Sequence, residues 1–130
     1  MPHTPMQHDT DPKVDLIKAV GKLDGLDIYH NQVLCAVYIR PEKTKGGIVL
    51  PDQHRNEDRH QSKVGLILKA GPDAFVDSTG VWFKEVSVKV HDWIVFRPSD
   101  GWNITVNGIL CRILKDENIR GRISHPDLVW

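Results

Sequence analysis

One segment, residues 43–52, holds the residues whose types and order point most directly to a chemical role. At its centre an aliphatic tripeptide lies between a glycine pair and a proline, in the order Gly46, Gly47, Ile48, Val49, Leu50, Pro51. The next residues, 53–63, are polar and show neither strand nor helix periodicity. Aliphatic side chains in a solvated loop favour binding to another protein, since burying each contributes roughly 1.5–3 kcal/mol. The alternative is a very short buried strand, interrupted at both ends by glycine and proline.

The other residues that could do chemistry form no catalytic pattern. The seven histidines are scattered, and the chain has no Cys-x-x-Cys pair, no phosphate-binding glycine loop and no Gly-x-Ser-x-Gly motif. His54 and His60 share a polar stretch with Glu57 and Asp58, which could hold a transition metal, but a solvated loop is the favoured interpretation. We therefore expect no enzyme activity, no cofactor and no metal site.

The charge balance limits the classes of partner. Lys plus Arg and Asp plus Glu each number 17, so the net charge is zero, which argues against nucleic acid or an anionic membrane as the main partner. No apolar run reaches membrane-spanning length, and the first residues lack the pattern of a signal peptide, so a cytoplasmic protein is expected. Cys35 and Cys111 lie in apolar runs, which favours two reduced, buried thiols.

Three parts are expected along the chain: an N-terminal arm with a short helix (1–25), a β domain (26–123) and a C-terminal tail (124–130). Asp11 is a suitable N-cap, Pro12 suits the first helical position and Gly21 can end the helix. A helix this short needs docking to be stable.

The β domain shows many short apolar or alternating runs separated by turn residues. The expected strands are 33–39, 64–70, 81–90, 93–96, 103–106, 109–114 and a last edge strand at 119–123. Asn107-Gly108 between two of these runs is a strong hairpin signal. This spacing, with almost no helix, predicts an all-β fold built as a small β-barrel.

Five stretches, in order, resemble the GroES-type co-chaperonins, the chaperonin 10 family. Residues 42–52 resemble the mobile loop of that family, and residues 31–34 resemble its first-strand motif. Residues 64–72 resemble the strand and glycine-containing turn after the loop. Residues 88–96 and 106–119 resemble the Val-Lys-Val-Gly-Asp motif and the closing hairpin. The order of the five pieces is more specific than any one of them.

The departures from the family indicate a divergent member, for which a phage or prophage origin is one interpretation. Gln32 stands where the family has a basic residue, and His91 stands where it has glycine. The stretch between Asp52 and Gly65 is longer than the family pattern, and residues 1–25 and 124–130 are additional.

The resemblance implies a homo-oligomeric ring, a heptamer in the family, that caps a GroEL-type chaperonin and assists ATP-dependent folding of client proteins by that partner. It implies that the chaperonin-binding contacts are Gly46, Gly47, Ile48, Val49, Leu50 and Pro51. It places a roof hairpin near 73–87, where Trp82 and Phe83 would face a client; packing in the barrel or at a subunit contact is the favoured alternative. It implies a subunit interface in which the first strand pairs with a neighbour's last strand, through Val33, Cys35, Val37, Ile119 and Ile123. Trp93, Trp102 and Trp130 are interpreted first as packing or interface residues.

A different functional class remains open. The same small barrel would also suit a structural protein that decorates or cements a phage capsid or another assembly, which would place it in a virion. An alcohol-dehydrogenase-like fragment is disfavoured, because the sequence has no nucleotide-binding domain and no zinc ligands.

Overall fold

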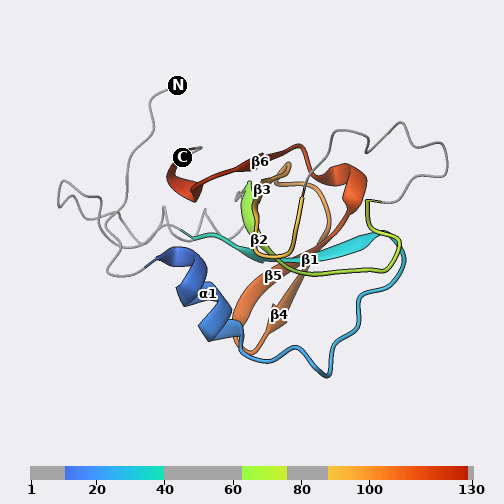
Figure 1. Cartoon of the computed structure of the whole chain (residues 1–130), viewed down its shortest axis with the longest axis horizontal. Coiled ribbons are helices and arrows are strands. Elements are labelled where there is room, and N and C mark those ends of the chain that lie inside the picture. Colours follow the sequence, from blue (N-terminus) through green and yellow to red (C-terminus); the bar gives the residue numbers. More distant parts are fainter. Residues whose placement is uncertain (1–10, 40–62, 76–87, 129–130) are drawn as a thin grey trace.

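The computed structural model describes residues 11–39, 63–75 and 88–128. Its framework is a six-stranded antiparallel sheet with the order β4-β5-β1-β2-β3-β6 (Figure 1). The strands are β1 (Gln32–Val37), β2 (Val64–Ala70), β3 (Trp93–Val95), β4 (Trp102–Val106), β5 (Ile109–Lys115) and β6 (Gly121–Ile123). Two 3₁₀ turns follow the last strands, at Asp116–Asn118 and Pro126–Leu128. This sheet, with one short helix, confirms the predicted all-β class.

Both faces of the central strands are apolar and buried. Alternate residues of a strand point to opposite faces of a sheet, and the buried side chains divide accordingly into two clusters. The first, which we call the helix-side cluster, contains Val20, Ile28, Leu34, Ala36, Tyr38, Val64, Leu66, Leu68, Trp93 and Cys111. The second, which we call the inner cluster, contains Val33, Cys35, Ile67, Ile94, Phe96 and Leu114.

Within residues 11–39, 63–75 and 88–128 there is one α-helix, α1 (Pro12–Val20), and it begins and ends where the sequence predicts. The Asp11 side chain accepts a hydrogen bond from the backbone N–H of Lys13 at 3.0 Å, and Gly21 ends the helix with a φ of 73°. Val20 is buried, whereas Val14 is 42% exposed, so one side of the helix faces the sheet. Neither α1 nor any other helix among the described residues is long and apolar enough to cross a membrane.

The predicted hairpin is present as β4 and β5. Asn107 and Gly108 connect the strands with φ angles of 50° and 81°, as a tight hairpin turn requires. β2 spans the predicted residues, and β6 is an edge strand as predicted. Of the predicted strand at 81–90, only residues 88–90 are described, and these are not in a strand.

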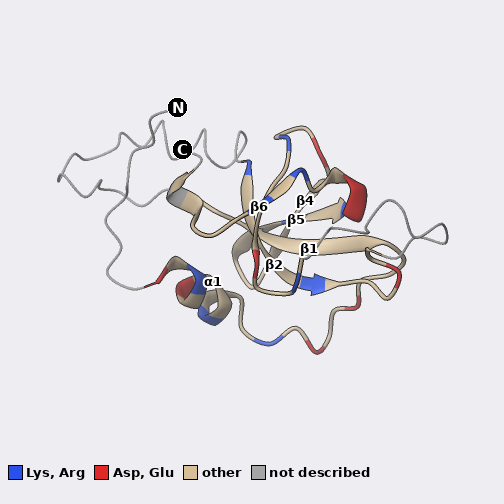
Figure 2. Cartoon of the chain, turned by 45° about the horizontal axis from the view of Figure 1, so that its top comes forward, with Lys and Arg blue, Asp and Glu red and all other residues tan. Residues whose placement is uncertain are grey.

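Charged residues lie mainly at the periphery of the fold. Figure 2 shows Lys and Arg interspersed with Asp and Glu on α1 and the loops, while the central strands carry few charges. The described surface thus offers mixed charges, in keeping with the zero net charge of the whole chain.

Candidate functional site

The predicted chaperonin-binding residues, 46–51, lie outside the described residues, but the structure describes the two strands that lead to and from them. β1 ends at Val37 opposite Gly65 of β2. One residue further, the Tyr38 N–H donates to the Val64 carbonyl at 3.0 Å, and the Phe96 N–H donates to the Lys63 carbonyl at 2.9 Å. The chain therefore leaves the sheet and returns to it at one hydrogen-bonded point, which we call the segment base.

Glycine at position 65 allows the close packing of this base. A Cβ atom there would lie 3.0 Å from Cys35 Sγ, 3.0 Å from the Phe96 ring and 3.1 Å from the Ala36 carbonyl oxygen. Two of these neighbours are parts of the inner cluster. A larger residue would push β2 away from β1 at the point where the predicted binding segment is attached.

The predicted roof residues Trp82 and Phe83 also lie outside the described residues. The turn that precedes them in the sequence is held by the carboxylate of Asp116. Asp116 is 4% exposed. Its Oδ2 accepts the Phe75 N–H at 2.9 Å and its Oδ1 accepts Asn31 Nδ2 at 3.1 Å. Phe75 has a φ of 62°, in the left-handed region that a bulky residue rarely adopts. Asp116 thus ties the turn after β2 to the start of β1 and to the end of β5.

The predicted interface residues of β1 belong to the chain's own core. Val33, Cys35 and Val37 are at most 2% exposed, and β1 pairs with β2 on one edge and with β5 on the other. Both edges of β1 are thus used within the chain, and an interface at Val33, Cys35 and Val37 stays a prediction.

The other two predicted interface residues lie near the last strand. Ile119 packs against the inner cluster and Ile123 against the helix-side cluster, and both are partly buried. β6 pairs with β3 through one edge and stands at the end of the strand order. Its other edge has no partner strand among the described residues, so an interface at Ile119 and Ile123 stays a prediction.

The two cysteines are separate, buried thiols. Cys35 lies opposite Arg112 in the β1–β5 register, and the thiols belong to different clusters, on opposite faces of the sheet. Both are free. Burial raises the pKa of the Cys35 thiol to about 12 and that of Cys111 to about 11. Neither has the lowered pKa of a reactive nucleophile. Among the described residues, no three His, Cys, Asp or Glu side chains are grouped to hold a metal.

Arg112 is a buried cation that the sequence did not indicate. It is 1% exposed, and its guanidinium lies 4.9 Å from the centre of the Phe96 ring. Nη1 donates to the carbonyls of Pro98 (2.8 Å) and Asp100 (3.2 Å), and Nε donates to Asn103 Oδ1 (3.0 Å). Burial lowers its pKa. The arginine organises the turn between β3 and β4, which is a structural role.

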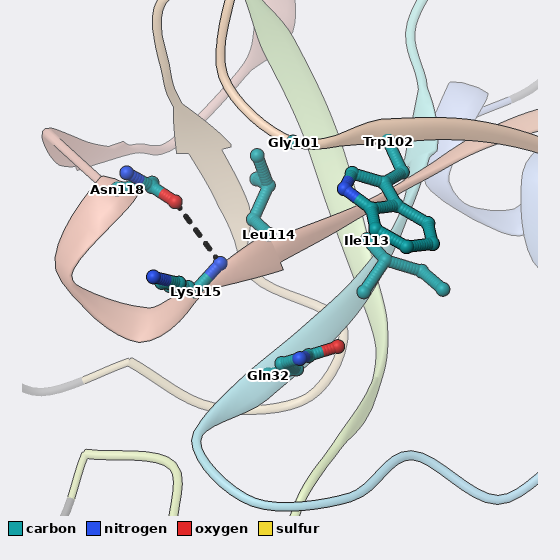
Figure 3. Close-up of a pocket in the computed structure, with 7 residues that line it drawn as sticks. All are labelled: Gln32, Gly101, Trp102, Ile113, Leu114, Lys115 and Asn118. Atoms are coloured by element: carbon teal, nitrogen blue, oxygen red, sulfur yellow. Dashed lines mark hydrogen bonds between the residues drawn. The ribbon is translucent and has the colours of Figure 1, made fainter.

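A surface pocket of about 360 Å³ lies at the start of β4 (Figure 3). Trp102 stands over it and is 77% exposed, so of its two predicted roles, packing is not seen among the described residues and an interface role stays a prediction. Ile113 and Leu114 supply apolar surface, while Gln32 and Asn118 supply polar groups. Gly101 beside it has a φ of 79°, and a Cβ atom there would lie 2.5 Å from the Ile113 carbonyl oxygen. The pocket offers a place for an apolar group but no catalytic arrangement.

Trp93 differs from Trp102 in its surroundings. It is 2% exposed, and its ring meets the Tyr38 ring edge-on, with centroids 5.7 Å apart and planes at 83°. This tryptophan packs in the core, as predicted, and joins β3 to the segment base.

The sequence model of the family described as "Chaperonin 10 Kd subunit" matches residues 26–123. The chain is 31% identical over 95 residues to Co-chaperonin GroES 5 of Rhizobium meliloti (strain 1021), covering 73% of this chain and 86% of that protein. It is 32% identical over 95 residues to the Co-chaperonin GroES of Rhodobacter capsulatus, covering 73% of this chain and 94% of that protein. It is 30% identical over the same length and with the same coverage to the Co-chaperonin GroES of Cereibacter sphaeroides (strain ATCC 17029 / ATH 2.4.9). The matched region contains all six strands of the sheet, and on this extent of similarity the chain belongs to the chaperonin 10 family.

Proposed function

We propose that this protein is a co-chaperonin that caps the chamber of a GroEL-type chaperonin, binding it through residues 46–51. The chain itself performs no catalysis in this role, and the partner hydrolyses ATP. The observation that carries the proposal is the segment base, where β1 and β2 flank the part of the chain that contains the Gly-Gly-Ile-Val-Leu-Pro stretch, in a member of the chaperonin 10 family. The proposed location is the cytoplasm.

The three aliphatic residues provide modest binding free energy per chain. Transfer free energies of apolar side chains indicate that burying Ile48, Val49 and Leu50 contributes about 5 kcal/mol or somewhat more. The entropy lost in ordering the backbone around them offsets much of this gain. One copy would therefore bind weakly. Several copies held in one ring raise the effective concentration of each remaining contact, so that weak contacts add to a firm but releasable cap.

Self-association is the second part of the proposal. Edge strands with unpaired backbone groups favour pairing with another chain, and β6 is such a strand among those described. A closed ring would use this edge, with Ile119 and Ile123 beside it. The expected number of copies is seven, which rests on the family, and the roof residues Trp82 and Phe83 are the proposed contacts to a folding client.

The test is complementation of a bacterial strain depleted of its own co-chaperonin. Wild type and Gln53→Asp should restore growth, whereas Ile48→Asp should not, because a charge cannot enter an apolar groove without a partner. Gln53→Asp introduces the same charge five positions away and is the matched control. Circular dichroism and sedimentation should show that all three proteins are folded and equally assembled.

Purified proteins give the decisive readout. Wild type should co-sediment with chaperonin only when nucleotide is present, and Ile48→Asp should lose this binding by at least about tenfold, since losing one aliphatic contact per subunit costs 1.5 kcal/mol or more. An unfolded Ile48→Asp variant would instead support the buried-strand alternative. Equal chaperonin binding by wild type and Ile48→Asp would refute the assignment of the binding segment.

A further inference from the structure

Residues 11–28 pack on the sheet, although the family match begins only at residue 26. The helix and the connection after it contribute two buried residues to the helix-side cluster, Val20 (1% exposed) and Ile28 (8% exposed). Four partly buried residues pack against the same cluster: Leu16, Ile17, Leu23 and Leu26. Figure 1 shows α1 beside the strands that it covers. This segment therefore closes one face of the sheet in this chain.

Polar contacts fasten the segment at its C-terminal half. Lys69 Nζ, from β2, donates to the backbone carbonyls of Leu23, at 3.2 Å, and of Leu26. Asn107 Nδ2, from the β4–β5 turn, donates to the carbonyl of Val20. These are carbonyls at and after the end of α1, which have no helical partner of their own. Two separate parts of the sheet thus hold the segment in place.

The covered face includes the segment base. Tyr38 and Val64, whose backbones are joined by the hydrogen bond that closes the base, are members of the helix-side cluster and are 3% and 0% exposed. Trp93 packs edge-on against Tyr38 in the same cluster. Residues 11–28 and the segment base therefore contribute to one and the same apolar cluster.

We propose that residues 11–28 form a strap that clamps the segment base and positions the binding segment for the chaperonin. A clamped base limits the opening of the Tyr38–Val64 pair, so fewer conformations are lost when the segment is ordered on a partner. Loosening the strap lowers chaperonin affinity without touching residues 46–51. The effect on affinity rests on the proposed function, whereas the clamp is a property of the free protein.

Two valines of α1 allow a matched test in the full-length protein. Val20→Ala removes a buried group of the strap, and Val14→Ala makes the same change at a position that is 42% exposed. Asn107→Asp is a milder second variant, because it removes the Nδ2 donor to the Val20 carbonyl and keeps a residue type that tolerates the positive φ of this turn. Amide hydrogen exchange at Tyr38 reports the base. Exchange at Asp116, whose N–H donates to the Asn31 carbonyl at the far end of β1, is the internal control.

The Tyr38 amide should exchange about tenfold faster in Val20→Ala than in Val14→Ala, because the lost apolar contacts shift the local opening equilibrium by that order. Asn107→Asp should accelerate it in the same direction, and Asp116 should change less than Tyr38 in both. Equal Tyr38 exchange in the two valine variants would overturn the clamp. Equal acceleration at Tyr38 and Asp116 would also overturn it, since it would indicate general destabilisation only.

Chaperonin binding by the same variants separates this inference from the proposed function. Val20→Ala should bind more weakly than Val14→Ala with the binding segment unchanged. If wild type binds no chaperonin, the proposed function fails, and the exchange data on the free protein still decide whether the strap exists.

Discussion

Replacing Arg112 by methionine should destabilise the protein far more than the same replacement at Arg97, fifteen positions earlier, whose guanidinium contacts the same turn. Arg112 is 1% exposed and donates to backbone carbonyls of the turn. The Arg97 side chain is 63% exposed and makes one ion pair, at 3.3 Å, with Asp100. The two variants remove the same charged group from a buried and an exposed position.

The magnitude follows from the contacts that each variant loses. Arg112→Met removes four hydrogen bonds of the guanidinium, to the Arg97, Pro98 and Asp100 carbonyls and to Asn103 Oδ1. A hydrogen bond from a charged donor contributes about 1.5–3 kcal/mol, and bonds that share one group do not add in full. The buried guanidinium of the wild type has a desolvation cost that methionine does not have, and this difference offsets part of the lost hydrogen-bond energy. A net loss of about 2–4 kcal/mol in the free energy of unfolding is expected. Arg97→Met should cost about 0–1 kcal/mol, as for other exposed ion pairs.

Urea denaturation followed by tryptophan fluorescence measures the difference, since Trp93 is buried in the fold. All proteins should be compared at one protomer concentration, because assembly contributes to apparent stability. A free energy of unfolding for Arg112→Met within about 1 kcal/mol of that for Arg97→Met would refute the reasoning, because it would mean that the turn carbonyls find other partners.

Three further predictions concern single residues. His91 has a φ of 74° and is exposed, so His91→Gly should raise the free energy of unfolding by about 0.5–1.5 kcal/mol, whereas Lys89→Gly should lower it. Chemical denaturation tests both variants, and a stabilised Lys89→Gly would contradict the argument. Burial raises the Cys35 pKa to about 12 from 9.0, so the stability that comes from burying the neutral thiol is complete below pH 9 and is lost as pH rises toward 12. Cys35→Ala should therefore lose less free energy of unfolding than wild type between pH 9 and 11. Equal losses in the two proteins over this pH range would count against the argument. Asp116→Asn leaves one acceptor oxygen for two donors, so it should lower the free energy of unfolding by about 1–2 kcal/mol and accelerate hydrogen exchange of the Phe75 amide. Unchanged exchange at Phe75 would show that the Asp116 carboxylate does not hold the turn after β2.

Features set by neighbouring residues were predictable from the sequence. The Asn107-Gly108 turn and the Asp11 cap depend on local backbone preferences, and both are present in the structure. β2 was predictable for a similar reason, because its apolar run ends at Gly71 and Pro72. The family resemblance was readable from the order of such local pieces.

Features set by distant contacts were not predictable. Arg112 lies in a strand whose pattern gave no sign of a buried cation, and it is buried because the turn between β3 and β4 folds over it. Trp102 was expected at a packing or an interface position, and the sequence could not tell which; it is 77% exposed, which excludes packing within the described fold. The run 33–39 was expected to pair with the last strand of a neighbouring subunit, and the order of the sheet shows that β1 also lies between two strands of its own chain. Each of these outcomes depends on tertiary packing.

The stretch between Asp52 and Gly65, which the sequence predicts to be longer than the family pattern, would add little to the cost of closing the loop above the segment base. The entropy of closing a loop grows only with the logarithm of its length, so a few added residues cost on the order of 0.2 kcal/mol when the ends are already fixed. The Val37–Gly65 pairing and the Tyr38–Val64 hydrogen bond fix these ends. Added length should therefore change how far residues 46–51 can reach much more than how tightly they bind. Deleting four residues within 53–62 should leave chaperonin affinity nearly unchanged wherever the shorter segment still reaches its groove. Deleting the same number from the strap, by contrast, should weaken binding, because it removes the restraint on the ends themselves.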